Sequence, residues 1–148
     1  MTLPPLLLIF DIDETLLQFI PPEIYHYGWE KTSPEYKKRL AKVCEYVDYP
    51  TRKCCFIFRT GLRTFLANIL SLVANGNVQL ALWTYGTRAY SAEVAQLITE
   101  HFGIISNPFL FTYGSEDIAD HTKPKSLNYI WNDPRYSGTF NKYNTLLI

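Results

Sequence analysis

Short, almost continuously apolar runs recur along this chain, and they constrain its fold more than any other feature. The four runs cover residues 6–10, 78–83, 109–111 and 146–148. Each has the length of a strand rather than a helix and shows no alternation of polar and apolar side chains, which is typical of strands covered on both faces of a parallel sheet. We therefore expect these four segments to form one buried sheet.

The segments between these runs have helical periodicity. Apolar side chains recur every three or four residues in 62–73, 90–102 and 33–47, which predicts three amphipathic helices. The third pattern is formed by Tyr36, Leu40, Val43, Cys44 and Val47. Strands that alternate with helices predict an α/β fold with a parallel sheet and flanking helices, in a single domain over residues 1–148.

Composition excludes two classes of protein. The 148 residues are 47% hydrophobic and 19% charged, which is too apolar for a disordered chain. The formal net charge is zero, so the sequence lacks the excess positive charge with which proteins neutralise nucleic-acid phosphates. We expect no nucleic-acid partner.

The apolar run at 6–10 is too short to span a membrane and has no basic flank typical of a signal peptide. We expect no membrane partner. The three cysteines, Cys44, Cys54 and Cys55, lack the spacing of a zinc site or a disulfide framework. We expect reduced thiols, with Cys54 and Cys55 packed in or beside a strand, and an intracellular location, nuclear or cytoplasmic.

Three acidic residues, Asp11, Asp13 and Glu14, directly follow the first apolar run. A carboxylate at a buried strand end is costly to desolvate, and two carboxylates at i and i+2 repel each other. A bound cation would resolve both problems, and oxygen ligands without nearby Cys or His favour Mg²⁺. The alternative is a turn in which Asp13 or Thr15 caps a short helix.

The segment Asp11-Ile12-Asp13-Glu14-Thr15-Leu16 resembles the DxDxT(L/V) signature of phosphatases in the haloacid dehalogenase superfamily. With Glu before Thr, it is most similar to the branch of RNA polymerase II C-terminal-domain phosphatases and NLI-interacting-factor-like proteins. Three later segments, 59–66, 83–90 and 125–127, resemble further motifs of this branch in the same order. The resemblance thus extends over most of the chain.

The resemblance implies roles for individual residues. Asp11 would be the nucleophile that forms an aspartyl-phosphate, and Asp13 would protonate the leaving oxygen and then activate water. Both would bind Mg²⁺. Thr84 would hydrogen-bond a phosphoryl oxygen, and Lys125 would offset its negative charge. The implied phosphate-binding residues are Thr15, Thr84, Gly86, Arg88, Lys123 and Lys125.

Two of these assignments stay open. Lys123 competes with Lys125 for the role of the motif lysine, because it lies only two residues earlier and precedes Pro124. Arg88 either contacts substrate or pairs and caps on its own helix.

The implied fold is a Rossmann-like parallel sheet whose central strand carries Asp11, with no large cap domain and one insertion over residues 18–58. The superfamily places a fourth acidic motif directly after a last apolar strand, for which residues 145–148 qualify. We therefore expect a domain truncated at the C-terminus, with the last core strands missing and an exposed sheet edge that favours a homodimer.

The resemblance favours a Mg²⁺-dependent phosphoserine or phosphothreonine protein phosphatase, because an uncapped site suits a phosphorylated protein or peptide. Two alternatives remain. One is a phosphatase of the same fold that acts on a small phosphorylated metabolite. The other is a catalytically impaired module that binds phosphopeptides through Thr84 and Lys125.

Overall fold

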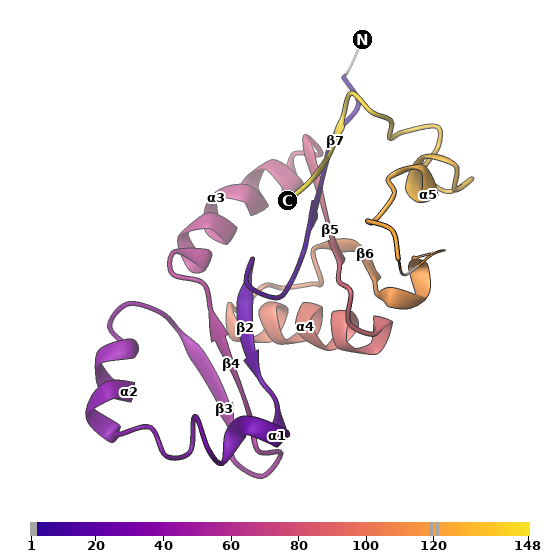
Figure 1. The fold of residues 1–148 in the computed structure, drawn as a ribbon. Coiled ribbons are helices and arrows are strands. Elements are labelled where there is room, and N and C mark those ends of the chain that lie inside the picture. The colour runs from indigo at the N-terminus through magenta and orange to yellow at the C-terminus, as the bar shows by residue number, and fades with distance from the viewer. Residues whose placement is uncertain (1–2, 119, 121) are drawn as a thin grey trace. The chain divides into compact units, whose positions relative to one another are not determined.

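The computed structural model of this chain describes residues 3–118, 120 and 122–148. The chain divides into two compact units (Figure 1), of which one comprises residues 1–12 and 66–148 and the other residues 13–65. The first unit contains β1 (Leu6–Phe10), most of α3 (Leu62–Ala74), β5 (Val78–Trp83), α4 (Arg88–His101), β6 (Phe109–Tyr113), a 3₁₀ turn (Ser115–Asp117), α5 (Asn128–Trp131) and β7 (Thr145–Leu147). The second unit contains β2 (Leu17–Ile20), α1 (Pro22–Tyr25), α2 (Pro34–Leu40), β3 (Tyr46–Tyr49) and β4 (Cys54–Phe58).

The first unit is built on a four-stranded sheet in the order β6-β5-β1-β7, in which every pair is parallel. All four strands lie where the apolar runs predict them. Leu8 of β1 is in register with Leu80 of β5 on one side and with Leu146 of β7 on the other. The strand that precedes Asp11 is therefore an inner strand, as expected.

Alternate residues of these strands pack against different layers. Leu7, Ile9, Ala81 and Trp83 belong to one buried cluster, which Ile130 of α5 completes. On the helix side, α4 packs against β5 and β6 and buries Val94 and Ile98. This layered α/β arrangement without a large cap confirms the predicted fold class.

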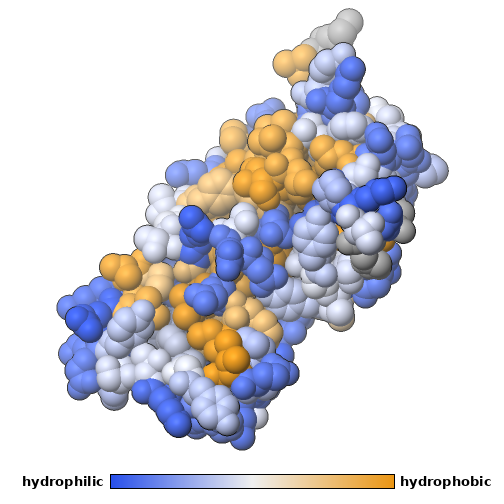
Figure 2. Space-filling model, viewed as in Figure 1, coloured by the Kyte–Doolittle hydropathy of each residue, from blue (hydrophilic) through white to orange (hydrophobic). Residues whose placement is uncertain are grey.

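β7 lies at one edge of the described sheet. Leu146 is 51% exposed there, and Figure 2 shows apolar surface gathered over this strand. An apolar strand edge is the kind of surface that pairs with another chain. The homodimer stays a prediction.

The second unit contains a three-stranded antiparallel sheet in the order β2-β4-β3. The expected insertion over residues 18–58 falls within this unit. On one face of the sheet, Phe19 stacks on Phe56 with 4.7 Å between ring centroids. On the other face, Tyr25 and Trp29 form a small core with Cys55.

The cysteines of the second unit are free thiols, and Cys54 and Cys55 are buried in β4. The prediction that this pair packs in a strand is confirmed. Burial is the main cause that raises the pKa of Cys55 to about 12, so its thiol is protonated and unreactive at neutral pH.

The predicted helix over 33–47 is only partly correct. Ser33 does begin a helix by accepting a hydrogen bond from the Tyr36 backbone N–H, but α2 ends at Leu40. Val47 lies in β3 instead, in register with Phe56 of β4. β-branched and aromatic side chains favour a strand when a partner strand is available, and this pairing overrides the helical period.

One further finding concerns membranes. Over the described ranges 3–118, 120 and 122–148, no helix combines the length and the apolar character needed to cross a bilayer.

Candidate active site

The first unit brings Asp11 and Lys125 into direct contact, although 114 positions separate them. Asp11 follows β1 directly, and its backbone N–H donates to the carbonyl of Ile148 at 2.9 Å. The Lys125 ammonium donates to Asp11 Oδ1 at 2.7 Å and to the Trp83 carbonyl at 2.5 Å. A carboxylate and a cation therefore meet at the carboxyl end of the parallel sheet, where ligands bind in this architecture.

Burial makes this ion pair asymmetric. The Lys125 side chain is only 5% exposed, whereas the Asp11 side chain is 33% exposed. A buried ammonium needs partners for its N–H donors, and Asp11 and the Trp83 carbonyl supply two of them. Tyr85 covers Lys125 with its ring, whose centroid lies 4.7 Å from the ammonium nitrogen. Asp11 thus keeps a solvent-facing part next to a fixed positive charge.

Thr84 and Gly86 come just after Trp83, whose carbonyl accepts a hydrogen bond from Lys125. Thr84 follows β5 directly and is buried, and its backbone N–H donates to the Tyr113 carbonyl at 3.1 Å. Its hydroxyl oxygen accepts a hydrogen bond from the Gly86 N–H at 3.0 Å. β5 is the neighbour of β1, so Thr84 and Asp11 lie at the same end of adjacent strands.

Arg88 pairs with a buried acid at the start of α4. Its guanidinium donates to both carboxylate oxygens of Asp117, at 2.7 and 3.1 Å, and Asp117 is 3% exposed. These hydrogen bonds raise the pKa of Arg88. The same carboxylate accepts the Gly114 N–H at 3.0 Å. In this structure Arg88 therefore joins the first turn of α4 to the segment after β6.

A second acid completes this junction. Glu116 accepts the Arg88 backbone N–H at 2.7 Å, and backbone N–H groups of Glu116 and Arg88 lower the pKa of the Glu116 carboxyl. A negative charge at this position stabilises the N-terminus of a helix.

Gly114 fits this junction only because it lacks a side chain. A Cβ atom at this position would lie 2.1 Å from the Arg88 backbone nitrogen and 2.4 Å from the Thr87 carbonyl carbon. We expect Gly114→Ala to lower the free energy of unfolding by about 3 kcal/mol, since overpacking against backbone cannot be relieved by a rotamer change. Chemical denaturation measures this change in the free energy of unfolding.

The matched control is Gly138→Ala, because no heavy atom lies within 4 Å of a Cβ added there. It should change stability by less than about 0.5 kcal/mol. Equal stability of the two alanine variants would contradict the tight packing of Gly114 against the start of α4.

Lys123, Asp13 and Thr15 complete the set of predicted site residues. The Lys123 side chain is 75% exposed and pairs with Asp120 at 3.4 Å. Asp13 and Thr15 belong to the second unit. There the exposed Asp13 forms an isolated backbone bridge with Leu17.

The turn after Asp13 is held from within the second unit. Glu14 has a left-handed backbone with φ of 63°, a conformation uncommon for residues other than glycine. Its N–H donates to the Leu17 carbonyl at 2.9 Å, and its carbonyl accepts from Arg59 Nη1 at 2.7 Å. The basic stretch at 59–66 thus begins with an arginine that fixes the DxDxT turn.

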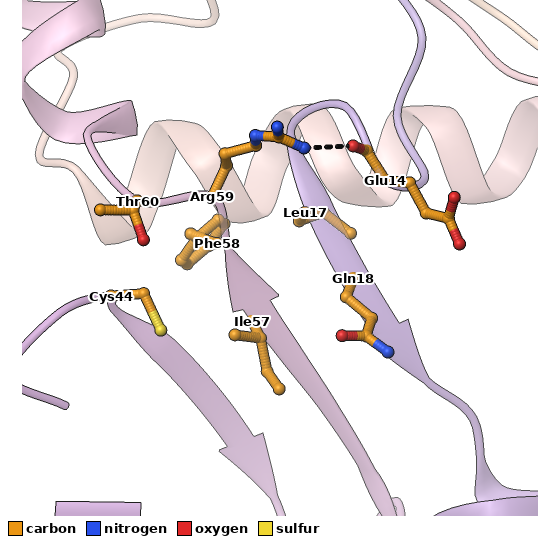
Figure 3. Close-up of a pocket in the computed structure, with 8 residues that line it drawn as sticks. All are labelled: Glu14, Leu17, Gln18, Cys44, Ile57, Phe58, Arg59 and Thr60. Atoms are coloured by element: carbon orange, nitrogen blue, oxygen red, sulfur yellow. Dashed lines mark hydrogen bonds between the residues drawn. The ribbon is translucent and has the colours of Figure 1, made fainter. Parts of the chain in front are cut away.

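The same part of the second unit contains a pocket of about 610 Å³ (Figure 3). It is lined by Glu14, Leu17, Gln18, Cys44, Ile57, Phe58, Arg59 and Thr60. Leu17 and Phe58 are buried and form an apolar floor, while Gln18, Arg59 and Thr60 provide polar groups. Such a mixture can hold a ligand by apolar contact and orient it by hydrogen bonds.

The donor set at Asp11 and Asp13 fits Mg²⁺. Both candidates are carboxylates, and this ion binds through one or two carboxylates while it keeps waters and substrate oxygens in its shell. In the part of the chain that the structure describes, no group of three or more His, Cys, Asp or Glu side chains is placed to hold a metal. Softer metals prefer thiolate and imidazole ligands, which Asp11 and Asp13 do not supply.

Sequence reasoning overlooked two residues that shape the site. Asp117, which holds Arg88, ends the short 3₁₀ turn that follows β6, and this acidic turn after an apolar strand was the available signal. Tyr85 lies inside the second motif between Thr84 and Gly86, but nothing in the sequence indicates that its ring lies over Lys125.

The chain is similar to a known protein family. A sequence model of the family described as NLI interacting factor-like phosphatase matches residues 6–142. No curated protein matches the chain.

Two solved structures share the fold. One is a variant of the fission yeast RNA polymerase II CTD phosphatase Fcp1 bound to beryllium fluoride, with 23% identity and a TM-score of 0.58 over 97% of this chain and 36% of that chain. The other is a structure of Fcp1, an essential RNA polymerase II CTD phosphatase, with 22% identity and a TM-score of 0.60 over 97% of this chain and 37% of that chain. This chain spans just over a third of each.

The match to the family model covers nearly the whole chain, and the similar structures have the same α/β fold. Together they confirm the resemblance found in the motifs. The chain belongs to the NLI interacting factor-like phosphatase family.

Proposed function

We propose that this chain is a Mg²⁺-dependent phosphatase that acts on phosphoserine or phosphothreonine in proteins through a phosphoryl group on Asp11. The observation that carries the proposal is the contact of 2.7 Å between Lys125 and Asp11 at the carboxyl end of the sheet. Phosphoryl transfer requires mainly positioning and charge stabilisation. A buried cation fixed on a partly exposed carboxylate supplies both.

In the first step a carboxylate oxygen of Asp11 attacks phosphorus, and the bond between phosphorus and the ester oxygen breaks. The Lys125 ammonium stabilises the negative charge on the phosphoryl oxygens, because it is held in place before substrate binds. The Thr84 hydroxyl donates a hydrogen bond to one of those oxygens. The Gly86 N–H donates to the same hydroxyl oxygen and thereby helps to orient it.

Asp13 handles the protons of both steps. It gives a proton to the departing ester oxygen, then takes one from the water that attacks the phosphoryl group on Asp11, so that inorganic phosphate leaves and both carboxylates return to their starting state. Asp13 lies two residues after Asp11, in the turn that Arg59 holds through the Glu14 carbonyl. That hydrogen bond restricts where Asp13 can lie.

Asp11 and Asp13 would hold Mg²⁺, which when bound neutralises part of the charge on the phosphoryl oxygens. Among the ion pairs of the described residues, Lys125 is the cation that contacts Asp11 directly.

A protein substrate is the best match to the comparisons. Fission yeast Fcp1 is an RNA polymerase II CTD phosphatase and has been solved with beryllium fluoride bound, and its substrate class is carried to this chain as part of the proposal. The absence of a large cap suits an extended peptide.

The test is release of inorganic phosphate from serine- and threonine-phosphorylated peptides by the purified chain. We expect turnover with Mg²⁺ and its loss with excess EDTA, recovered when Mg²⁺ is restored. Glycerol phosphate serves as the small-metabolite comparison.

Other outcomes favour the alternatives. Faster hydrolysis of small phosphate esters than of phosphopeptides would favour a metabolite phosphatase. Phosphopeptide binding that is independent of Mg²⁺ and is not followed by phosphate release would favour a binding module.

A further inference from the structure

Tyr85 contacts the site in a way that the proposed reaction does not use. It lies between Thr84 and Gly86, and its side chain is exposed although it is large and aromatic, with 55% of its surface open to solvent. The Lys125 ammonium nitrogen lies 4.7 Å from its ring centroid, well inside the range of about 6 Å over which a cation and an aromatic face attract each other.

The ring completes the surroundings of Lys125. A lysine ammonium has three N–H donors, and the Asp11 carboxylate and the Trp83 carbonyl accept two of them. The aromatic face attracts the ammonium without a directional acceptor atom. A phosphoryl oxygen can therefore accept the third N–H in place of the ring. A carboxylate in the position of the Tyr85 ring would compete with the substrate for that N–H.

The ring also excludes water from the ammonium. Lys125 is 5% exposed, and the ring of Tyr85 is one of the groups that lie against its ammonium. Electrostatic interactions weaken as water enters a site, so the cover strengthens the action of Lys125 on the phosphoryl group.

We propose that Tyr85 is a positioning residue: its ring holds the Lys125 ammonium on Asp11 and shields it from water, so that the cation acts at full strength in phosphoryl transfer. This inference rests on the proposed function. It assigns to Tyr85 an effect on the chemical step rather than on the stability of the fold.

The test compares Tyr85→Phe, which keeps the ring, with Tyr85→Leu, which keeps an apolar side chain but removes the aromatic face. We expect Tyr85→Leu to lower kcat by about 3- to 30-fold with little change in KM, the range that a cation–π contact covers. Tyr85→Phe should restore kcat to within about twofold of the wild type.

A spectroscopic signature reports the contact independently of turnover. Protons that lie over an aromatic face resonate upfield, so the Lys125 ε-methylene protons should be shifted upfield in the wild type and in Tyr85→Phe. In Tyr85→Leu this shift should be lost.

Tyr143→Leu is the matched control. Its ring lies 5.0 Å from the Lys142 ammonium, so the same substitution removes the same kind of contact. Tyr143 precedes β7 and therefore lies at the amino end of the parallel sheet, opposite to Asp11. Both kcat and the Lys125 resonances should be unchanged in Tyr143→Leu.

Failure of this inference can be distinguished from failure of the proposed function. An unshifted Lys125 resonance in the wild type, or an unchanged kcat in Tyr85→Leu, would overturn the role of Tyr85. A wild-type chain that releases no phosphate would count against the proposed function.

In that case the probe is beryllium fluoride, whose affinity should fall in Tyr85→Leu and be kept in Tyr85→Phe. Equal affinities, or no binding by the wild type, would overturn the positioning role.

Discussion

Replacement of Asp11 by asparagine should lower turnover of a phosphopeptide by at least about 1,000-fold, which is the scale of effect seen when a covalent nucleophile is removed. The amide has nearly the same shape and can still accept the Lys125 hydrogen bond through its oxygen. It cannot form the phosphoryl bond, because it carries no negative charge and is a poor nucleophile. Steady-state phosphate release at saturating Mg²⁺ measures the loss.

Asp133→Asn is the matched control for this variant. Asp133 also forms a short ion pair, at 2.6 Å to Arg135, so the same substitution removes a similar contact elsewhere in the first unit. Its turnover should stay within about threefold of the wild type, since it affects no group at the site. Thermal melting shows whether both variants are folded. A folded Asp11→Asn that retains a tenth of the activity would exclude Asp11 as the nucleophile.

Replacement of Lys125 by methionine should lower kcat by about 100- to 1,000-fold, the usual effect when one preorganised group that stabilises developing negative charge is removed. Methionine keeps the unbranched apolar stem of a side chain that is 5% exposed, so packing is largely preserved. The lost ammonium leaves the Asp11 carboxylate and the Trp83 carbonyl without their common donor. Kinetics with a phosphopeptide measure the effect.

Lys123→Met separates the two lysine candidates. The Lys123 side chain is 75% exposed and pairs with Asp120, so this variant should keep nearly the full kcat. A large loss in Lys123→Met together with a small loss in Lys125→Met would reverse the assignment of the motif lysine.

The inner strands of the first unit, β1 and β5, were predictable because nearly all of their residues are buried. The runs at 6–10 and 78–83 are apolar at every position except Gln79, and they match β1 and β5 residue for residue. Such runs need no information about neighbours, since only a covered strand tolerates them. The helix α4 was predictable for a related reason: its apolar stripe is sustained over several turns and a capping Thr87 begins it.

In the second unit β3 was harder to predict, because it is short and only partly buried. Every residue of β3 is half-buried, so its side chains do not alternate strongly between apolar and polar. Val47 therefore fitted a helical period as well as a strand. Its place in β3 depends on the pairing with Phe56 of β4, which is a contact between segments and is not encoded in the local pattern.

The candidate site was likewise only partly predictable from the sequence. The positions of Asp11 and Thr84 follow from strand ends and were predictable. The resemblance favoured Lys125 as the motif lysine but left Lys123 open, because both flank Pro124 and only the folded chain directs one of them into the sheet end. The role of Arg88 depended likewise on Asp117, a residue 29 positions away.

The central claim is that Asp11 carries the phosphoryl group, and the most direct test is to trap it. The chain is mixed with a phosphopeptide and Mg²⁺, quenched in acid during turnover, digested and examined by mass spectrometry. The account predicts a phosphoryl group on Asp11 in the wild type and none in Asp11→Asn. Phosphate release by a chain whose Asp11 is never modified, or a phosphoryl group found on another residue, would contradict it.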